Sequence, residues 1–111
     1  MYREKAVSKY GNRKTELDGM VFDSRKEAQR WAELKLMERG RLISGLERQV
    51  PFEIIPKTDK YRAVKYVADF VYIDAKTGEK VVEDCKGMCT ELYKIKKKLV
   101  YWKYGIDIIE T

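Results

Sequence analysis

The sequence predicts a single α/β domain in which two helices accompany a sheet. Apolar residues recur at strand spacing in some segments and at helix spacing in others, in the order hairpin, helix, three strands, helix and strand. With 111 residues, of which 44% are hydrophobic, the chain is long enough for one folded core. We therefore expect one domain over residues 15–111, preceded by a basic N-terminal arm over residues 1–14.

Local signals in the first half of the chain predict a hairpin, a helix and a strand. The pair Asp18-Gly19 lies between two short alternating segments and is typical of a tight hairpin turn. Ser24, with Glu27 three residues later, predicts the start of a helix that ends near Gly40. Residues 43–55 should then form a strand.

The second half is predicted to hold two paired strands, a helix and a last strand. The strands cover about residues 61–73 and 81–86, and a short turn between them makes the pair antiparallel. Thr90 should cap a helix that reaches about residue 103. Four residues of this helix recur at helical spacing and are expected in the core: Leu92, Ile95, Leu99 and Trp102.

Charge and composition restrict the function. The net charge is +6 and the isoelectric point is near 9.3, which suits a negatively charged partner such as nucleic acid, although a merely basic domain has the same balance. The chain has no histidine, which excludes histidine-based hydrolysis and zinc sites with histidine ligands. No apolar run is long enough to span a membrane, and we expect the two cysteines to be reduced in the cytoplasm.

Two acids and a lysine stand out within the paired strands. Alternation places Asp84 and Lys86 on one face of their strand, and Asp69 can lie opposite them on the neighbouring strand. Adjacent carboxylates repel one another, and a divalent cation between them relieves this repulsion. The alternative is that both acids form ordinary salt bridges with Lys86. Their apolar flanking residues favour a functional role, because charges within apolar strands are costly.

These residues also resemble a known motif. Ala68-Asp69-Phe70 and Glu83-Asp84-Cys85-Lys86-Gly87 are similar to the signature of PD-(D/E)XK nucleases, with Ala68 in place of the motif's proline. More narrowly, the chain resembles small phage-encoded endonucleases related to Holliday-junction resolvases. The resemblance covers roughly residues 24–110 and implies a restriction-endonuclease-like αβββαβ core, in which two helices flank a mixed central sheet.

The resemblance also implies a site. Asp69, Asp84 and Glu27 would bind Mg²⁺, for which Mn²⁺ could substitute, and Lys86 would act beside them. Glu27 has a competing role as part of a helix cap, and Glu83 should be structural because it lies on the opposite strand face. Residues expected to contact DNA, against the alternative of plain solvent exposure, are Gln49, Tyr93, Lys94, Lys96, Lys97 and Lys98.

The sequence thus predicts a magnesium-dependent endonuclease that acts on branched DNA as a homodimer, in the cytoplasm of a bacterium or a phage-infected host. One alternative is a nicking or duplex-end nuclease similar to the end-cleaving subunits of transposons. Another is a basic nucleic-acid-binding module without catalysis, in which Asp69 and Asp84 are structural.

Overall fold

The protein is described by a computed structural model that covers residues 3–7, 13–85 and 89–111. In chain order, its elements are β1 (Arg3–Val7), β2 (Arg13–Leu17), β3 (Met20–Phe22), α1 (Arg25–Arg39), β4 (Ile43–Ile55), β5 (Val64–Asp74), β6 (Lys80–Asp84), α2 (Glu91–Tyr104) and β7 (Ile109–Glu110). The order from α1 to β7 confirms the predicted helix, three strands, helix and strand.

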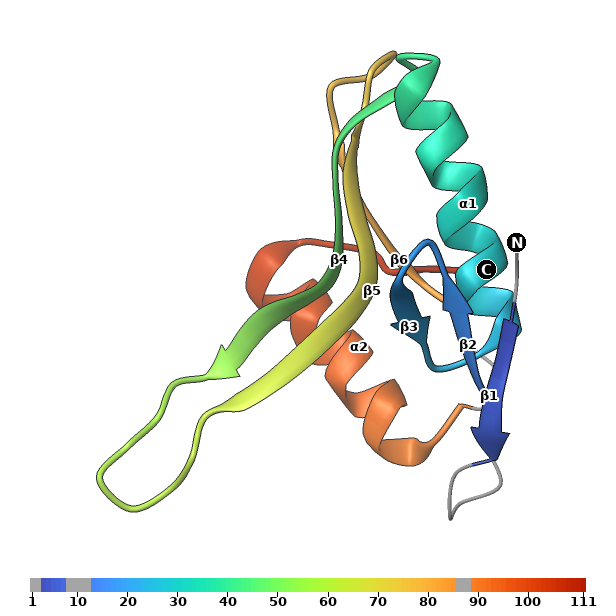
Figure 1. Ribbon diagram of the computed structural model, residues 1–111. Coiled ribbons are helices and arrows are strands. Elements are labelled where there is room, and N and C mark those ends of the chain that lie inside the picture. Colours follow the sequence, from blue (N-terminus) through green and yellow to red (C-terminus); the bar gives the residue numbers. More distant parts are fainter. Residues whose placement is uncertain (1–2, 8–12, 86–88) are drawn as a thin grey trace.

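The strands form two sheets. β4, β5 and β6 are antiparallel neighbours, and β7 joins the edge of β6 in parallel, so the larger sheet is mixed as expected. The smaller sheet holds β1, β2 and β3 and is antiparallel. Figure 1 shows α1 on one side of the long strands and α2 on the other side. The fold is therefore the predicted α/β class with two helices around a central sheet.

Local capping chemistry explains where both helices begin. The Oγ of Ser24 accepts the N–H of Glu27 at 3.1 Å, and the Oγ1 of Thr90 accepts the N–H of Tyr93 at 3.1 Å. At the end of α2, Gly105 adopts the left-handed conformation with φ of 68° and closes the last turn. These boundaries match those that the sequence predicts.

The N-terminal segment differs from the prediction. The hairpin turn at Asp18 and Gly19 is confirmed, because both residues have positive φ, of 52° and 79°, as a tight hairpin requires. The segment expected to be an arm, however, contains the strand β1, which pairs antiparallel with β2. Apolar and polar residues alternate only weakly in this segment, so its sequence does not indicate a strand. The strand β1 forms because it pairs with β2.

Helix α1 joins the two sheets into one body. Its Ala28 packs with Phe22 of the small sheet, whereas Leu34 packs with Phe70 of the large sheet. Trp31 lies between these contacts, with ring centroids 6.2 Å from Phe22 and 5.9 Å from Phe70. The small sheet is therefore held beside the N-terminal turn of α1, where Glu27 lies.

The predicted core face of α2 is wrong for three of its four residues, whereas Leu99 is partly buried and packs against the core. Tyr93 and Val100 are the buried residues of this helix, and they pack against the core side of β4 and β5. Leu92, Ile95 and Trp102 are exposed, with 77% of Trp102 accessible to solvent. Three seven-residue apolar spacings coexist in this helix, and the pair Tyr93 and Val100 is the one that the fold buries.

A kink in the central strands changes which residues face which helix. Gln49 in the middle of β4 has φ of 54°, a left-handed conformation that is uncommon outside glycine. In the paired strand β5, Ala68 belongs to the core beneath α2, whereas Phe70 belongs to the core beneath α1. Simple alternation would place both side chains on one face. Asp69 therefore lies at the point where the strand pair changes faces.

In the described ranges of the chain, no helix combines the length and apolar character that a membrane crossing requires.

Candidate active site

The register of β5 and β6 brings Asp69 and Asp84 together. Phe70 pairs with Glu83, so the next step along both strands places Asp69 across from Asp84. The backbone N–H of Cys85 donates to Oδ2 of Asp69 at 2.8 Å and fixes the orientation of that carboxyl. On the other side of β6, the pairing of Asp84 with Glu110 of β7 holds its backbone in place. The proximity of the two acids that the sequence predicts is thus confirmed.

Glu27 reaches the same place from α1. Its side chain is only 5% exposed, and its Oε1 accepts a hydrogen bond from Nε2 of Gln49 at 3.2 Å. The same Nε2 also lies 3.4 Å from Oδ1 of Asp69, so Gln49 bridges the two acids. Four elements thus contribute to one group, which we name the acid cluster: Glu27, Gln49, Asp69 and Asp84.

Burial and mutual repulsion raise the pKa values of two acids of the cluster. The pKa of Asp69 is raised to about 7 by burial and then by the nearby carboxylates of Glu27 and Asp84. Burial also raises the pKa of Glu27, helped by Asp23, while Arg48 opposes this shift from a distance of 3.9 Å. In this environment, a proton or a cation would stabilise the cluster.

Two neighbours that sequence reasoning missed shape this environment. The hydroxyl of Tyr66 donates to Oδ2 of Asp84 at 2.6 Å, and it lies within the core beneath α2. Arg48 donates from Nη2 to the carbonyl of Val21 at 3.0 Å and stacks over the ring of Phe22 at 4.3 Å. Arg48 directly precedes Gln49, and an arginine within a half-apolar strand was the available signal. For Tyr66, no local pattern indicates its partner.

The acid cluster opens into a cleft of about 780 Å³. The cleft is bordered by the first turn of α1, the middle of β5 and the N-terminal part of α2. Three lysines line it: Lys26, Lys65 and Lys96. Carboxylates at the base and cations at the rim are the arrangement expected where a phosphate is brought to an acidic centre.

The sequence model of one protein family matches residues 7–108. The chain belongs to DUF1064, a family described as proteins of unknown function. The match includes the whole acid cluster and every element from β2 to α2. Among curated proteins and among solved structures, no significant match to this DUF1064 protein was found.

The lysines predicted on α2 of the DUF1064 protein separate into two groups. Lys96 lines the cleft of the acid cluster, whereas Lys94, Lys97 and Lys98 line a second hollow on another side of the helix. Lys94 is paired with Glu91 at 3.3 Å, and Lys97 with Glu110 at 3.5 Å. Only Lys96 of these four is placed to act near the acids.

The remaining predicted residues have different surroundings. Tyr93 borders the cleft, but it is buried and its hydroxyl donates to Glu110 at 2.7 Å. Glu83 lies on the opposite strand face, as expected, where it is bound by both Arg30 and the hydroxyl of Tyr72. These bonds give Glu83 a structural role, as predicted. Lys86 lies outside the described residues.

The acid cluster has the donor chemistry of a divalent metal site. Its donors are carboxylate and amide oxygens, the ligands that Mg²⁺ and Mn²⁺ prefer, and the pKa values of Asp69 and Glu27 are raised. Among the described residues, however, no three Cys, Asp or Glu side chains are arranged as a formed set of ligands. The amide nitrogen of Gln49 lies between Glu27 and Asp69. The chemistry fits, and binding requires this amide to turn or withdraw.

Proposed function

We propose that this DUF1064 protein is a divalent-metal-dependent endodeoxyribonuclease of the PD-(D/E)XK type. The observation that carries the proposal is the convergence of Asp69, Asp84 and Glu27 at the base of a lysine-lined cleft. Buried carboxylates with raised pKa values concentrate at functional sites, because a fold gains nothing from placing like charges together. Without histidine, this acid cluster is the best candidate for hydrolytic chemistry.

The residues of the cluster have separate roles in this proposal. Glu27, Asp69 and Asp84 would hold Mg²⁺, which when bound polarises phosphate oxygens and lowers the pKa of a water molecule. Tyr66 holds one oxygen of Asp84, and the Cys85 N–H holds one oxygen of Asp69, so each acid keeps a defined orientation. Lys96, on the rim of the cleft, would bind a phosphate of the incoming strand.

Lys86 is proposed to orient the attacking water or to neutralise the charge that develops on the phosphate. Arginine cannot replace a compact ammonium at such a position. We expect Lys86→Ala and Lys86→Arg to lower single-turnover cleavage about a hundredfold or more, with DNA binding within a few-fold of wild type. A normal cleavage rate in Lys86→Arg would remove Lys86 from the mechanism.

Branched DNA is the proposed substrate, and two copies of the chain would cut its two strands. One chain supplies one acid cluster, so symmetrical cutting requires a homodimer. The net charge of +6 supports binding to a polyanion. Sedimentation of the protein with a four-way junction would show whether two chains bind one junction.

The decisive experiment is incubation with labelled duplex, flap, fork, four-way junction and single-stranded DNA, in magnesium, manganese or EDTA. Cleavage of branched DNA only with metal, abolished in Asp84→Asn, is the expected result. Asp107→Asn is the matched control, because Asp107 is an exposed aspartate outside the cleft. Undiminished cleavage by a folded Asp84→Asn protein would overturn the proposal. Cleavage at duplex ends, or nicking of one strand of a duplex, would instead favour the alternative of a nicking or duplex-end nuclease.

A non-catalytic nucleic-acid-binding module is the second candidate. It is favoured by the absence, within the described ranges, of three acidic or cysteine side chains arranged as metal ligands. Under this alternative, the acids remain protonated or hydrogen-bonded, and DNA binding is the same in magnesium and in EDTA. Equal binding in both conditions with no cleavage of any substrate would select this function.

A further inference from the structure

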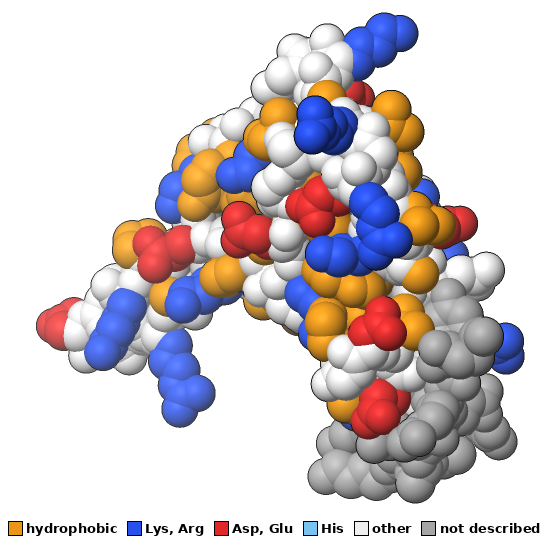
Figure 2. Space-filling view, turned by 45° about the horizontal axis from the view of Figure 1, so that its top comes forward, with side chains coloured by type: hydrophobic (Ala, Val, Ile, Leu, Met, Phe, Trp, Pro, Cys, Tyr) orange, Lys and Arg blue, Asp and Glu red, His pale blue; other side chains and the backbone are white. Residues whose placement is uncertain are grey.

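The β4–β5 hairpin extends beyond the rest of the molecule. Figure 1 shows it as a long projection at lower left, beyond the end of α2, and Figure 2 shows Lys and Arg side chains along the same projection. We name its end, residues 56–63, the hairpin tip. The tip carries Lys57, Lys60 and Arg62 against one acid, Asp59. All four side chains are exposed.

The hairpin tip has a defined turn. The N–H of Thr58 donates to the carbonyl of Tyr61 at 2.9 Å, and Oγ1 of Thr58 accepts the N–H of Tyr61 at 2.8 Å. The same Oγ1 accepts the N–H of Lys60 at 3.2 Å. These bonds fix the backbone of the turn without help from the body of the protein. The tip therefore presents its side chains in a set arrangement.

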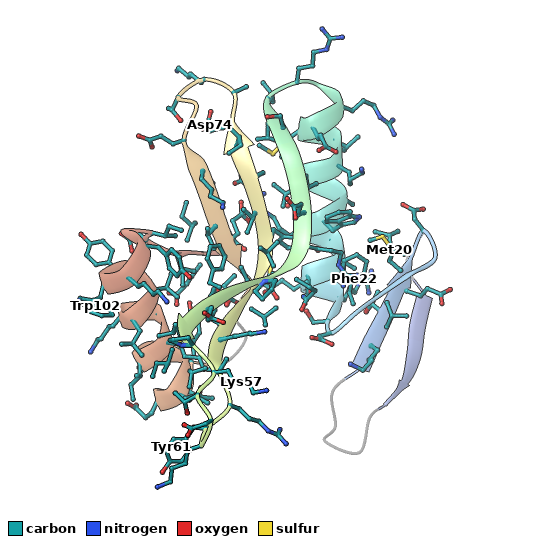
Figure 3. All side chains as sticks on the ribbon, turned by 90° about the vertical axis from the view of Figure 1, so that its left-hand side faces the viewer. Met20, Phe22, Lys57, Tyr61, Asp74 and Trp102 are labelled. Atoms are coloured by element: carbon teal, nitrogen blue, oxygen red, sulfur yellow. The ribbon has the colours of Figure 1, made fainter. Side chains whose placement is uncertain are left out.

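Tyr61 is the aromatic residue presented by this turn. Figure 3 shows it at the far end of the hairpin, where 68% of it is exposed. Its described ring neighbour is the ammonium of Lys60, 5.5 Å from the ring centroid. An exposed aromatic ring among cations is the combination that binds unpaired nucleotides, because bases stack on the ring and the cations contact phosphates.

The hairpin tip is continuous with the acid cluster along β5. Lys65 and Val67 line the cleft that holds Asp69, so a strand bound at the tip can follow β5 to the acids. Paired bases in a duplex are already stacked and offer no free face to Tyr61. A tip of this kind therefore favours the unpaired bases that occur at forks, flaps and junctions.

From this geometry we infer that the hairpin tip binds an unpaired segment of the DNA substrate, with Tyr61 stacked on a base and the tip cations on its phosphates. The inference deepens the proposed function and rests on it for the identity of the substrate. It assigns the preference for branched DNA to the tip, whereas the acid cluster would perform the cleavage.

The test is a binding titration in calcium, which is expected to support binding without turnover, on a fork with 2-aminopurine at the branch and on a matched duplex. Tyr61→Ala should weaken fork binding about tenfold and duplex binding less than twofold. Tyr61→Phe should retain both affinities, because stacking needs only the ring. Tyr101→Ala is the control, since Tyr101 is an exposed tyrosine on α2.

Stacking on Tyr61 should also change the 2-aminopurine fluorescence on binding, and Tyr61→Ala should abolish that change. The inference would be overturned if Tyr61→Ala bound the fork and the duplex as tightly as the wild-type protein does. It would also be overturned if the wild-type protein bound neither DNA. Cleavage is measured separately in magnesium. If Tyr61→Ala loses the preference for forks but the wild-type protein cleaves no DNA, the role of the hairpin tip is supported and the proposed nuclease activity is overturned. If the wild-type protein cleaves DNA with metal but Tyr61→Ala changes no affinity, the nuclease activity is supported and the role of the hairpin tip is overturned.

Discussion

At the scale of single residues, Asp69 couples the stability of the protein to pH. Its pKa is raised to about 7 by burial and by the carboxylates of Glu27 and Asp84, whereas an unfolded aspartate titrates at about 4. Folding therefore favours the protonated form. The stabilisation is complete below about pH 4 and is lost as the pH rises through about 7. Metal-free protein should thus unfold at lower urea concentration at pH 8 than at pH 5.

Urea unfolding in EDTA at both pH values measures this effect. The same experiment on Asp69→Asn should show a smaller loss between pH 5 and pH 8, because the amide does not ionise. If the site binds a divalent ion, magnesium should restore stability at pH 8 more than at pH 5, since the ion competes with the proton. A stability that rises from pH 5 to pH 8 in EDTA would contradict the assignment.

Ser24 and Glu27 have different roles at the start of α1: Ser24 caps the helix, and the side chain of Glu27 belongs to the acid cluster. The cap is made by the Oγ of Ser24 and the backbone N–H of Glu27, while the Glu27 side chain turns to Gln49. Glu27→Gln should therefore retain the cap and relieve repulsion, so that stability is unchanged or higher while cleavage is lost. Ser24→Ala should do the opposite, lowering the free energy of unfolding by about 1 kcal/mol with cleavage retained.

Thermal unfolding and cleavage rates of both variants, measured side by side, provide the comparison. Wild-type cleavage by Glu27→Gln would restrict Glu27 to structure. The two residues are close in sequence, so a general disturbance of the first turn of α1 would affect both variants alike. Opposite responses can arise only if the cap and the acid are distinct.

At the scale of elements, α2 presents two groups of lysines to solution. Lys96 borders the acid cleft, whereas Lys94 is exposed and paired with Glu91. A lysine that neutralises a phosphate contributes about one unit to the salt slope of binding. Lys96→Gln should lower the slope by about this amount, and Lys94→Gln should leave it nearly unchanged. Binding titrations over a range of salt concentrations measure both slopes, and equal slopes for Lys96→Gln and wild type would exclude this contact.

The boundaries of the elements could be predicted because their signals are local. Ser24, Thr90 and Gly105 act through bonds to residues within four positions, so the sequence is sufficient to locate both helices. Which face of a helix is buried depends on the surface against which the helix packs. Tyr93 and Val100 are buried because they fit the surface beneath them, and the equally regular Leu92 and Ile95 are left exposed.

The candidate site was predictable in part for a similar reason. Asp69 and Asp84 were found because a short hairpin fixes their register, and strand alternation needs no distant information. Tyr66 and Arg48 were missed because their partners come from other elements. Gln49, predicted as a DNA contact, lies beside Glu27 and Asp69, but its positive φ and the change of strand face at Asp69 could not be read from propensity.

At the scale of the whole molecule, the ion pair between Arg30 and Glu83 connects α1 to the central sheet. Arg30 donates from Nε and Nη2 to the two carboxylate oxygens of Glu83, at 2.8 and 2.7 Å, although 53 positions separate them. The side chain of Glu83 is 1% exposed, and Tyr72 also donates to it. Loss of Arg30 would leave a buried carboxylate without its cation.

Arg30→Met should therefore lower the free energy of unfolding by about 3 kcal/mol, the cost of an uncompensated buried charge. The double variant Arg30→Met with Glu83→Leu should recover most of this loss, because it removes the buried charge together with its partner. Urea unfolding of both proteins at pH 7 is the measurement. Since Glu83 lies on the face away from the acid cluster, the double variant should retain cleavage within a few-fold. A double variant as unstable as Arg30→Met would mean that the pair stabilises the fold by itself, rather than only compensating a charge that the sheet has buried.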